Sequence, residues 1–194
     1  MRSGSVEVSF KKQHDEIITG GEFEPWITRD AITLIDSLLK PSMTGWEWGC
    51  GSSTVWLLDR VKFLYTVEHD AGWADYTRKH IAPCTGFLDK WHLQVIPNDN
   101  VQADDSRYID CGGISRVRYC KAINKVPYGL DFIFIDGRAR RGCISEAVKH
   151  LNKGGFLVLD NSDRAEYYPN AIPDAWQKIV TTNGIWETAV YKND

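Results

Sequence analysis

Short apolar runs with strand character alternate with segments of helical period along most of this 194-residue chain. The runs are rich in β-branched and aromatic residues, and the helical segments repeat their apolar residues every three or four positions. Such alternation is typical of a parallel, doubly wound sheet covered by helices on both faces. The expected strands are 44–48, 62–68, 91–96, 131–135 and 156–159; the expected helices are 26–39, 52–60, 71–81 and one that contains Cys143 and Leu151 and ends at Gly154-Gly155.

The end of the chain departs from this alternation. Two further strand-like runs, 176–182 and 185–191, flank Asn183-Gly184, a dipeptide typical of two-residue hairpin turns. The sequence therefore predicts one Rossmann-like α/β domain over residues 1–194, with three layers built around a mostly parallel, seven-stranded sheet that ends in an antiparallel hairpin. The domain begins with a polar leader, 1–24.

Segment 98–128 interrupts the pattern, because it is polar, contains Gly112-Gly113 and has no sustained apolar period. Connections of this length are usually functional or disordered. We expect it to form a cap or an insertion at the active site.

The composition argues against several kinds of protein. The net charge is −3 and the pI is near 6.0, so the chain lacks the large positive field that binds nucleic acid. No apolar run approaches the ~18 residues of a membrane span, and the first residues show no secretory signal. The five cysteines are scattered without a C-x-x-C pair, which argues against a disulfide framework or a zinc site. We expect a cytoplasmic protein with a small-molecule partner; a homo-oligomer is left open.

Polar residues follow each of the five expected parallel strands. In an open α/β sheet the ligand crevice lies beyond the carboxyl ends of the strands, so these residues are the first candidates for a site. They are Gly49-Cys50-Gly51, Glu68-His69-Asp70, Asn98-Asp99-Asn100, Asp136-Gly137-Arg138 and Asp160-Asn161-Ser162.

The glycine loop at 49–51 suits the close approach of a ligand to bare backbone, beside a helix N-terminus that favours negative charge. We expect Ser52 or Ser53 to cap that helix. Thr54 stands where a dinucleotide-binding loop needs its third glycine, which weighs against a nicotinamide cofactor. Glu68, one strand later, is placed to accept hydrogen bonds from ribose hydroxyls.

The segment 46–53, with the sequence WEWGCGSS, resembles the E-x-G-x-G-x-S motif of class I S-adenosylmethionine-dependent methyltransferases. Segments 128–137 and 151–160 resemble the same family's fourth-strand and fifth-strand motifs. The resemblance implies S-adenosylmethionine as cofactor, with its methionine part near the glycine loop, its ribose at Glu68 and its adenine near Asp99. The implied cofactor-binding residues are Glu47, Gly49, Cys50, Gly51, Ser52, Glu68, His69, Asp99 and Asp136.

A finer similarity is to the catechol and caffeoyl-type O-methyltransferases. Asp136, Asp160 and Asn161 stand where that family binds a divalent ion, and their oxygen atoms suit Mg²⁺. The family's lysine base, however, is replaced here by the arginine-rich run 138–141, and arginine keeps its proton at neutral pH. The alternative is a metal-free carboxylate at Asp136, with Asp160-Asn161 forming a turn.

The expected catalytic residues are Asp136, Arg138 and His69. His69 suits a general base, although a structural contact beside the ribose position is the simpler interpretation. An arginine cluster can hold a carboxylate or phosphate of the acceptor, or can serve as an internal ion-pair donor. The cluster comprises Arg138, Arg140, Arg141 and Arg164.

The sequence thus predicts methyl transfer to a small, anionic acceptor, with oxygen as the attacking atom. Two alternatives stay open. One is a non-enzymatic or regulatory module that binds the cofactor without turnover, and the other is an NAD-dependent oxidoreductase of related fold.

Overall fold

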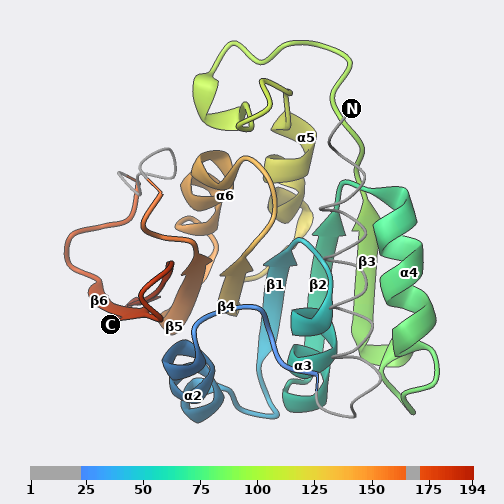
Figure 1. The fold of residues 1–194 in the computed structure, drawn as a ribbon, viewed down its shortest axis with the longest axis vertical. Helices are drawn as coiled ribbons and strands as arrows, with labels where there is room; N and C mark the ends of the chain where they lie inside the picture. The colour runs from blue at the N-terminus through green and yellow to red at the C-terminus, as the bar shows by residue number, and fades with distance from the viewer. Residues whose placement is uncertain (1–22, 165–170) are drawn as a thin grey trace.

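A computed structural model describes residues 23–164 and 171–194, so most of the expected polar leader lies outside the described residues. Seven strands form one sheet in the order β3-β2-β1-β4-β5-β7-β6 (Figure 1). The strands are β1 (Thr44–Trp48), β2 (Phe63–Glu68), β3 (Trp91–Val95), β4 (Leu130–Ile135), β5 (Leu151–Asp160), β6 (Gln177–Thr182) and β7 (Glu187–Lys192). The helices are α2 (Arg29–Leu38), α3 (Ser52–Arg60), α4 (Ala71–Ile81), α5 (Val117–Cys120) and α6 (Arg140–Ala147), with short 3₁₀ turns η1 (Leu88–Lys90), η2 (Ser106–Tyr108) and η3 (Lys121–Lys125).

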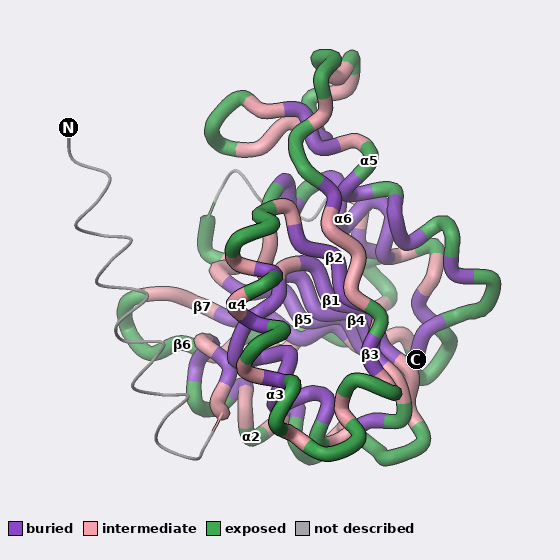
Figure 2. Tube along the Cα trace, turned by 90° about the vertical axis from the view of Figure 1, so that its right-hand side faces the viewer, coloured by how far each residue is buried: buried purple, intermediate pink, exposed green. Residues whose placement is uncertain are grey.

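The first five strands pair in parallel, whereas β7 runs antiparallel to both β5 and β6. This confirms the predicted mostly parallel, seven-stranded sheet with an antiparallel end. Helices α2, α3 and α4 pack on one face, while α5, η3 and α6 pack on the other. Figure 2 shows the strands buried between these two layers.

Strand β4 explains the most continuous apolar run of the chain. Phe132 and Phe134 belong to the core under α2 and α3, whereas Ile133 and Ile135 belong to the core under α6. All four side chains are 0% exposed. A strand buried on both faces needs apolar residues at every position, so its run does not alternate.

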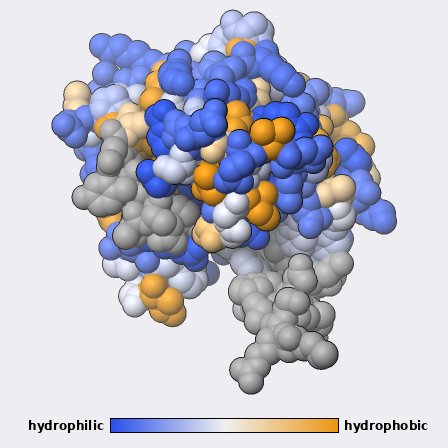
Figure 3. All heavy atoms as spheres, turned by 90° about the horizontal axis from the view of Figure 1, so that it is seen from above, coloured by the Kyte–Doolittle hydropathy of each residue, from blue (hydrophilic) through white to orange (hydrophobic). Residues whose placement is uncertain are grey.

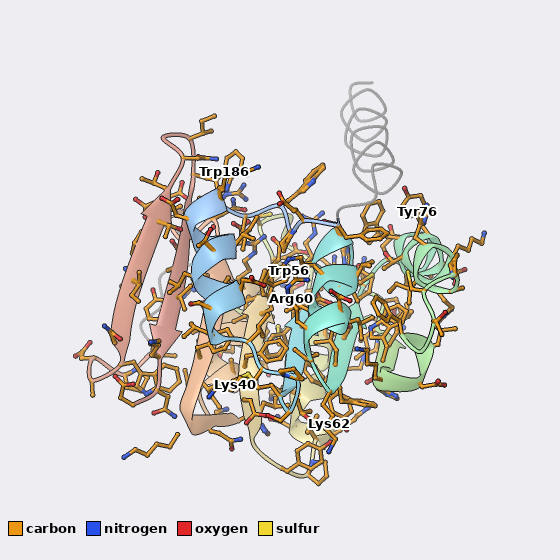
Figure 4. All side chains as sticks on the ribbon, turned by 90° about the horizontal axis from the view of Figure 1, so that it is seen from below. Lys40, Trp56, Arg60, Lys62, Tyr76 and Trp186 are labelled. Atoms are coloured by element: carbon orange, nitrogen blue, oxygen red, sulfur yellow. The ribbon has the colours of Figure 1, made fainter. Side chains whose placement is uncertain are left out.

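Helices α2 and α3 are joined at the surface through one arginine (Figure 4). Arg60 on α3 lies 4.2 Å from the centre of the Trp56 ring, and its Nε donates to Asp36 Oδ1 of α2 at 2.6 Å. Both contacts are partly exposed, so they orient the two helices and contribute little to stability.

Strand β5 begins earlier than the sequence predicts. Helix α6 ends at Ala147, and Gly154-Gly155 lies inside β5, so the prediction that this pair ends a helix is wrong. Gly154 has φ of +80°, and its N–H donates to the carbonyl of Asn193. The glycine pair therefore forms an irregularity in β5, where the register with β4 shifts, rather than a helix cap.

The hairpin between β6 and β7 has a longer turn than predicted. Residues 183–186 separate the strands, and Asn183 Oδ1 accepts from the backbone N–H of Ile185 and Trp186 at 2.9 and 3.0 Å. The asparagine side chain thus closes a four-residue loop, with Gly184 at φ +83°.

Segment 98–128 contains two different parts. In its second half, Tyr119, Cys120 and Ile123 are 0% exposed and belong to the core with α6, because very short helices place apolar side chains without a long period. In its first half, Asp110 accepts from Arg116 Nε at 3.0 Å, and these side chains are 5% and 4% exposed. This buried ion pair holds the loop between η2 and α5.

No helix in the described ranges has the length and apolar content needed to cross a bilayer.

Breaking that ion pair should destabilise the whole domain. We expect Arg116→Met to lower the free energy of unfolding by ~3–5 kcal/mol, because it leaves the Asp110 charge buried without its partner. The measurement is urea-induced unfolding followed by circular dichroism. Arg118→Met is the matched control: Arg118 also pairs with an aspartate, Asp99 at 2.7 Å, but its side chain is 59% exposed, so we expect a loss below ~1 kcal/mol. Equal losses would contradict the assignment.

Candidate functional site

A cavity of about 510 Å³ opens at the carboxyl ends of β1, β2 and β4. Figure 3 looks onto this end of the molecule, where mainly hydrophilic surface surrounds a smaller group of hydrophobic residues. The cavity brings together three of the five polar strand ends that the sequence singles out. It is lined by Trp26, Gly49, Cys50, Gly51, Ser52, Ser53, Glu68, His69, Asp70, Trp73, Asp136, Gly137, Arg138, Arg140 and Arg164.

The floor of this cavity depends on two glycines that touch. Gly49 follows β1 with φ of +89°, and a Cβ built on it would lie 3.0 Å from the Cα of Gly137. A Cβ on Gly137 would lie 1.9 Å from the hydroxyl oxygen of Tyr119. The ends of β1 and β4 can therefore approach only as bare backbone. The sequence predicted bare backbone at Gly49 for the approach of a ligand, whereas the described atoms nearest to its missing Cβ belong to Asp136 and Gly137.

Glu47 does not reach the cavity, which corrects its expected place beside the cofactor. It is 0% exposed and accepts from Ser53 Oγ at 2.6 Å, Thr54 Oγ1 at 2.8 Å and Thr66 Oγ1 at 3.0 Å. The residue joins β1, β2 and the start of α3 from below the glycine loop. Burial raises the pKa of Glu47 to about 8, against the effect of the three hydroxyl donors.

The predicted serine cap is also absent. Helix α3 starts at Ser52, with Gly51 at the N-cap position and no side-chain cap. Ser53 donates to Glu47, and Thr54 Oγ1 accepts from the Gly51 N–H at 2.9 Å. The hydroxyl groups of Ser53 and Thr54 thus both donate to Glu47, which holds the first turn of α3.

Glu68 is the acidic group that the structure places at the cavity. Its Oε1 accepts from the N–H groups of His69 and Asp70 at 2.7 and 2.9 Å, and its Oε2 accepts from the Cys50 N–H at 3.1 Å. Although burial opposes ionisation, the hydrogen bonds from His69, Asp70 and Cys50 lower the pKa of Glu68 below its ordinary value. Glu68 therefore presents a fixed negative charge at the end of β2.

His69 lies in the cavity as a partner of Glu68. Its Nδ1 is 2.6 Å from Glu68 Oε1, and its ring stands edge-on to Tyr119 with the centroids 6.2 Å apart. These contacts fit the structural interpretation of His69. The predicted role as a general base would have to use Nε2, because Nδ1 faces the Glu68 carboxylate.

Asp99 lies outside the cavity, which corrects its expected place near the adenine. It accepts from Arg118 Nε at 2.7 Å and from Ser115 Oγ at 3.3 Å. Asp99 thus joins the beginning of the 98–128 segment to residues later in the same segment. Two tryptophans that the sequence analysis missed line the cavity instead, Trp26 and Trp73. Trp73 Nε1 donates to the Cys50 carbonyl at 2.6 Å. The sequence could have indicated Trp73, because it lies in the first turn of the helix that follows Glu68, and that turn faces the crevice.

A third group of residues forms around Arg140. Its Nη2 donates to Asp136 Oδ1 at 2.7 Å, its Nη1 lies 3.7 Å from Asp160 Oδ2, and its Nε donates to the Gly137 carbonyl at 3.1 Å. Ala139, at φ of +45°, turns the chain just before Arg140. Burial raises the pKa values of both carboxyl groups, that of Asp160 to about 7, and the Arg140 guanidinium partly offsets this rise.

This arrangement does not fit the divalent ion predicted for Asp136, Asp160 and Asn161. The Arg140 guanidinium already stands between the two carboxylates, and Asp160 Oδ1 also accepts from Thr188 Oγ1 at 3.0 Å. No group of three or more His, Cys, Asp or Glu side chains suited to a metal occurs in residues 23–164 and 171–194. Asn161, at φ of +50°, forms the turn after β5, as the alternative interpretation proposed.

The four arginines of the expected cluster divide into different roles. Arg140 is buried and serves as an internal ion-pair donor, so its place in an acceptor-binding cluster is corrected. Arg138 and Arg164 line the cavity and are exposed, whereas Arg141 does not line it.

No protein-family model and no curated protein matches the chain. Solved structures do match. A putative O-methyltransferase from Klebsiella pneumoniae is 14% identical with a TM-score of 0.62 and covers 100% of this chain and 92% of its own. An rRNA methylase from Streptococcus thermophilus is 12% identical with a TM-score of 0.62, covering 87% of this chain and 99% of its own. A putative methyltransferase from Streptococcus mutans in complex with SAH is 13% identical with a TM-score of 0.57, covering 86% and 99%.

The chain has a class I methyltransferase fold. This confirms the predicted resemblance at the level of the fold. The methyltransferase fold places the carboxyl ends of β1, β2 and β4 around a single cavity, and the glycine loop and Glu68 of this chain meet there.

The two buried glutamates should give opposite pH dependences. The pKa of Glu47 in the folded state lies above its ordinary value of 4.5. Between pH 4.5 and about 8, Glu47 is therefore protonated in the folded state and ionised in the unfolded state. The stability that this proton supplies is complete below pH 4.5 and is lost as the pH rises to 8. The free-energy difference between wild type and Glu47→Gln should therefore fall with rising pH, by on the order of 5 kcal/mol.

Glu68→Gln is the matched comparison. The pKa of Glu68 is lowered, so its contribution is present above its ordinary pKa and is lost as the pH falls through the folded value. Urea unfolding of both variants and wild type at several pH values between about 2.5 and 9 measures the two slopes, that of Glu68 below pH 4.5 and that of Glu47 above it. Slopes of the same sign would contradict the assigned charge states.

Removal of Arg140 should create a response to Mg²⁺. Wild-type protein should keep its thermal midpoint when Mg²⁺ is added, because the guanidinium holds the place between Asp136 and Asp160. Arg140→Ala should be less stable without metal, and Mg²⁺ at ten times its dissociation constant should restore ~1.4 kcal/mol. Arg141→Ala is the control, since it removes a neighbouring exposed arginine. A midpoint shift in wild type would contradict this account of the cluster.

Proposed function

We propose that this protein transfers the methyl group of S-adenosylmethionine to an oxygen of a small-molecule acceptor. The observation that carries the proposal is Glu68, a carboxylate held ionised in a cavity of about 510 Å³ beside the glycine loop. Within residues 23–164 and 171–194, Glu68 Oε2 accepts one backbone hydrogen bond, from the Cys50 N–H, and so retains acceptor capacity for the ribose hydroxyls.

The other parts of the cavity suit the remaining parts of that cofactor. The N-terminus of the nine-residue helix α3 favours the carboxylate of the methionine part. Trp26 and Trp73 offer aromatic faces to the adenine in place of Asp99. The bound cofactor would supply an activated methyl group, so the protein contributes mainly by orienting the acceptor.

Asp136 is the group proposed to take the acceptor's proton. Its side chain is 31% exposed at the cavity, and burial raises its pKa, partly offset by Arg140. Asp136 would accept the hydroxyl proton of the acceptor when the bound cofactor supplies its methyl group. The cofactor would lose its positive charge in that transfer and Asp136 its negative charge, so charge is balanced.

Two alternatives remain outcomes of the test. Arg140 neutralises part of the charge of Asp136, which favours a cofactor-binding module without turnover. An NAD-dependent oxidoreductase is disfavoured by Thr54, which is 0% exposed and hydrogen-bonded to Glu47 where a third glycine would be needed. The cytoplasmic location and the absence of a nucleic-acid partner stay predictions from the sequence, and the oligomeric state stays open.

Calorimetric titration with S-adenosylhomocysteine and with NADH tests the cofactor. We expect S-adenosylhomocysteine to bind and NADH not to bind. Glu68→Ala should weaken the affinity at least about tenfold, because it removes a charged hydrogen-bond acceptor. Asp75→Ala is the control, since Asp75 lies on the same side of the fold on α4 but is 65% exposed. Unchanged affinity in Glu68→Ala would overturn the ribose assignment.

Product formation from labelled S-adenosylmethionine tests turnover. A panel of phenols, hydroxy acids and amines should yield methylated product from an oxygen acceptor. Binding of S-adenosylhomocysteine together with inactivity on the whole panel would favour the binding module.

A further inference from the structure

A second, smaller cavity of about 280 Å³ lies beside the first. One wall is the loop around η2, and the other is the turn that leads from β4 into α6. The two cavities share Gly137, Arg138 and Arg140, so a single backbone segment separates them. The smaller cavity is lined by Ser106, Ile109, Asp110, Cys111, Gly137, Arg138, Ala139, Arg140 and Arg141.

Both walls are held in place by internal contacts. Asp110 accepts from the N–H groups of Gly112 and Ile114 as well as from Arg116, so its carboxylate is already saturated and neutralised. Tyr108 Oη donates to Glu146 of α6 at 2.5 Å, which fastens η2 to the opposite wall. The cavity therefore has a built shape.

The charges that remain in this cavity are positive. Arg140 is committed to Asp136 and Asp160, and Asp110 is committed to Arg116. The side chains of Arg138 and Arg141 are exposed, and within residues 23–164 and 171–194 neither makes a hydrogen bond or an ion pair. The charge of Arg141 helps to lower the pKa of Asp105, but the ion pair of Asp105 is with Arg107, at 2.7 Å.

We propose that this second cavity is the acceptor subsite and that it selects small acceptors that carry an oxyanion, with Arg138 and Arg141 binding that group. Two guanidinium groups suit a carboxylate or a phosphate, because their paired N–H donors match its oxygen atoms. The volume fits a single-ring hydroxy acid. Arg138 lines both cavities, so an acceptor held there extends its hydroxyl over Gly137 toward the first cavity. The inference rests on the proposed function for its methyl donor, and on this cavity alone for its ligand class.

Thiol labelling tests the ligand class without any turnover. Cys111 lines the cavity and is exposed, whereas three of the other four cysteines are buried and Cys84 is partly buried. In a Cys84→Ser background, 4-hydroxybenzoate should slow the reaction of Cys111 with a neutral aromatic disulfide at least fivefold. Neutral 4-hydroxybenzamide should not slow it. Inorganic phosphate as a third arm distinguishes a phosphate site from a carboxylate site.

The arginine variants supply the decisive comparison. Arg138→Gln/Arg141→Gln should abolish the protection by 4-hydroxybenzoate, and Arg78→Gln, an exposed arginine on α4, should retain it. Equal protection by the acid and the amide, or protection that survives in the double variant, would overturn the subsite. Calorimetry with S-adenosylhomocysteine separates the two proposals: protection without cofactor binding would sink only the proposed function, and cofactor binding without protection would sink only the subsite.

With an active enzyme, kcat/KM gives a second readout. Wild type should prefer 4-hydroxybenzoate to 4-hydroxybenzamide at least tenfold in kcat/KM, and the double variant should lose this preference. A preference that persists in the double variant would overturn the assignment.

Discussion

The Arg140 guanidinium controls the arrangement of the active end of the sheet. It stands between two carboxylates that would otherwise repel each other, and it also donates to the backbone carbonyls of Asp136 and Gly137. An arginine cannot lose its proton at physiological pH, so this positive charge is permanent. Asp136 therefore keeps its position at the cavity without a metal ion.

The two buried glutamates show how one residue type serves two purposes one strand apart. Glu47 is surrounded by hydroxyl groups and apolar core, and the cost of burying its charge raises its pKa to about 8. Glu68 receives backbone N–H groups and His69, which lower its pKa despite burial. The first glutamate supports the glycine loop from beneath, and the second is available to a ligand.

The fold could be predicted because both of its signals are local. The continuous apolar run of β4 and the alternation of strand-like with helical segments indicated a parallel sheet. In a parallel sheet the carboxyl ends of the strands lie at the same edge, so the polar residues that follow the strands were expected there together. Glu68, Gly49 and Asp136 were placed correctly at the cavity by that rule alone. The role of Gly154-Gly155 was predicted wrongly, since a glycine pair is equally typical of a helix end and of a strand irregularity, and only the pairing of β5 with its neighbours decides between them.

The errors at the site have a common physical origin. Whether Asp99 faces the cavity depends on Arg118, nineteen residues away, and whether Asp160 can bind a metal depends on the direction of Arg140. The direction of such a side chain depends on the backbone turn before it. Ala139, in the left-handed region, directs Arg140 in this way, and composition and spacing do not reveal that conformation. Trp26 and Trp73 were missed because aromatic residues are equally common in the core.

Residues Gly137, Arg138 and Arg140 line both cavities, so the segment 137–140 forms part of two binding surfaces at once. Any effect that this segment transmits from a ligand in one cavity to a ligand in the other must act with equal free energy in the reverse direction. The two cavities therefore cannot be altered independently by a substitution in this segment.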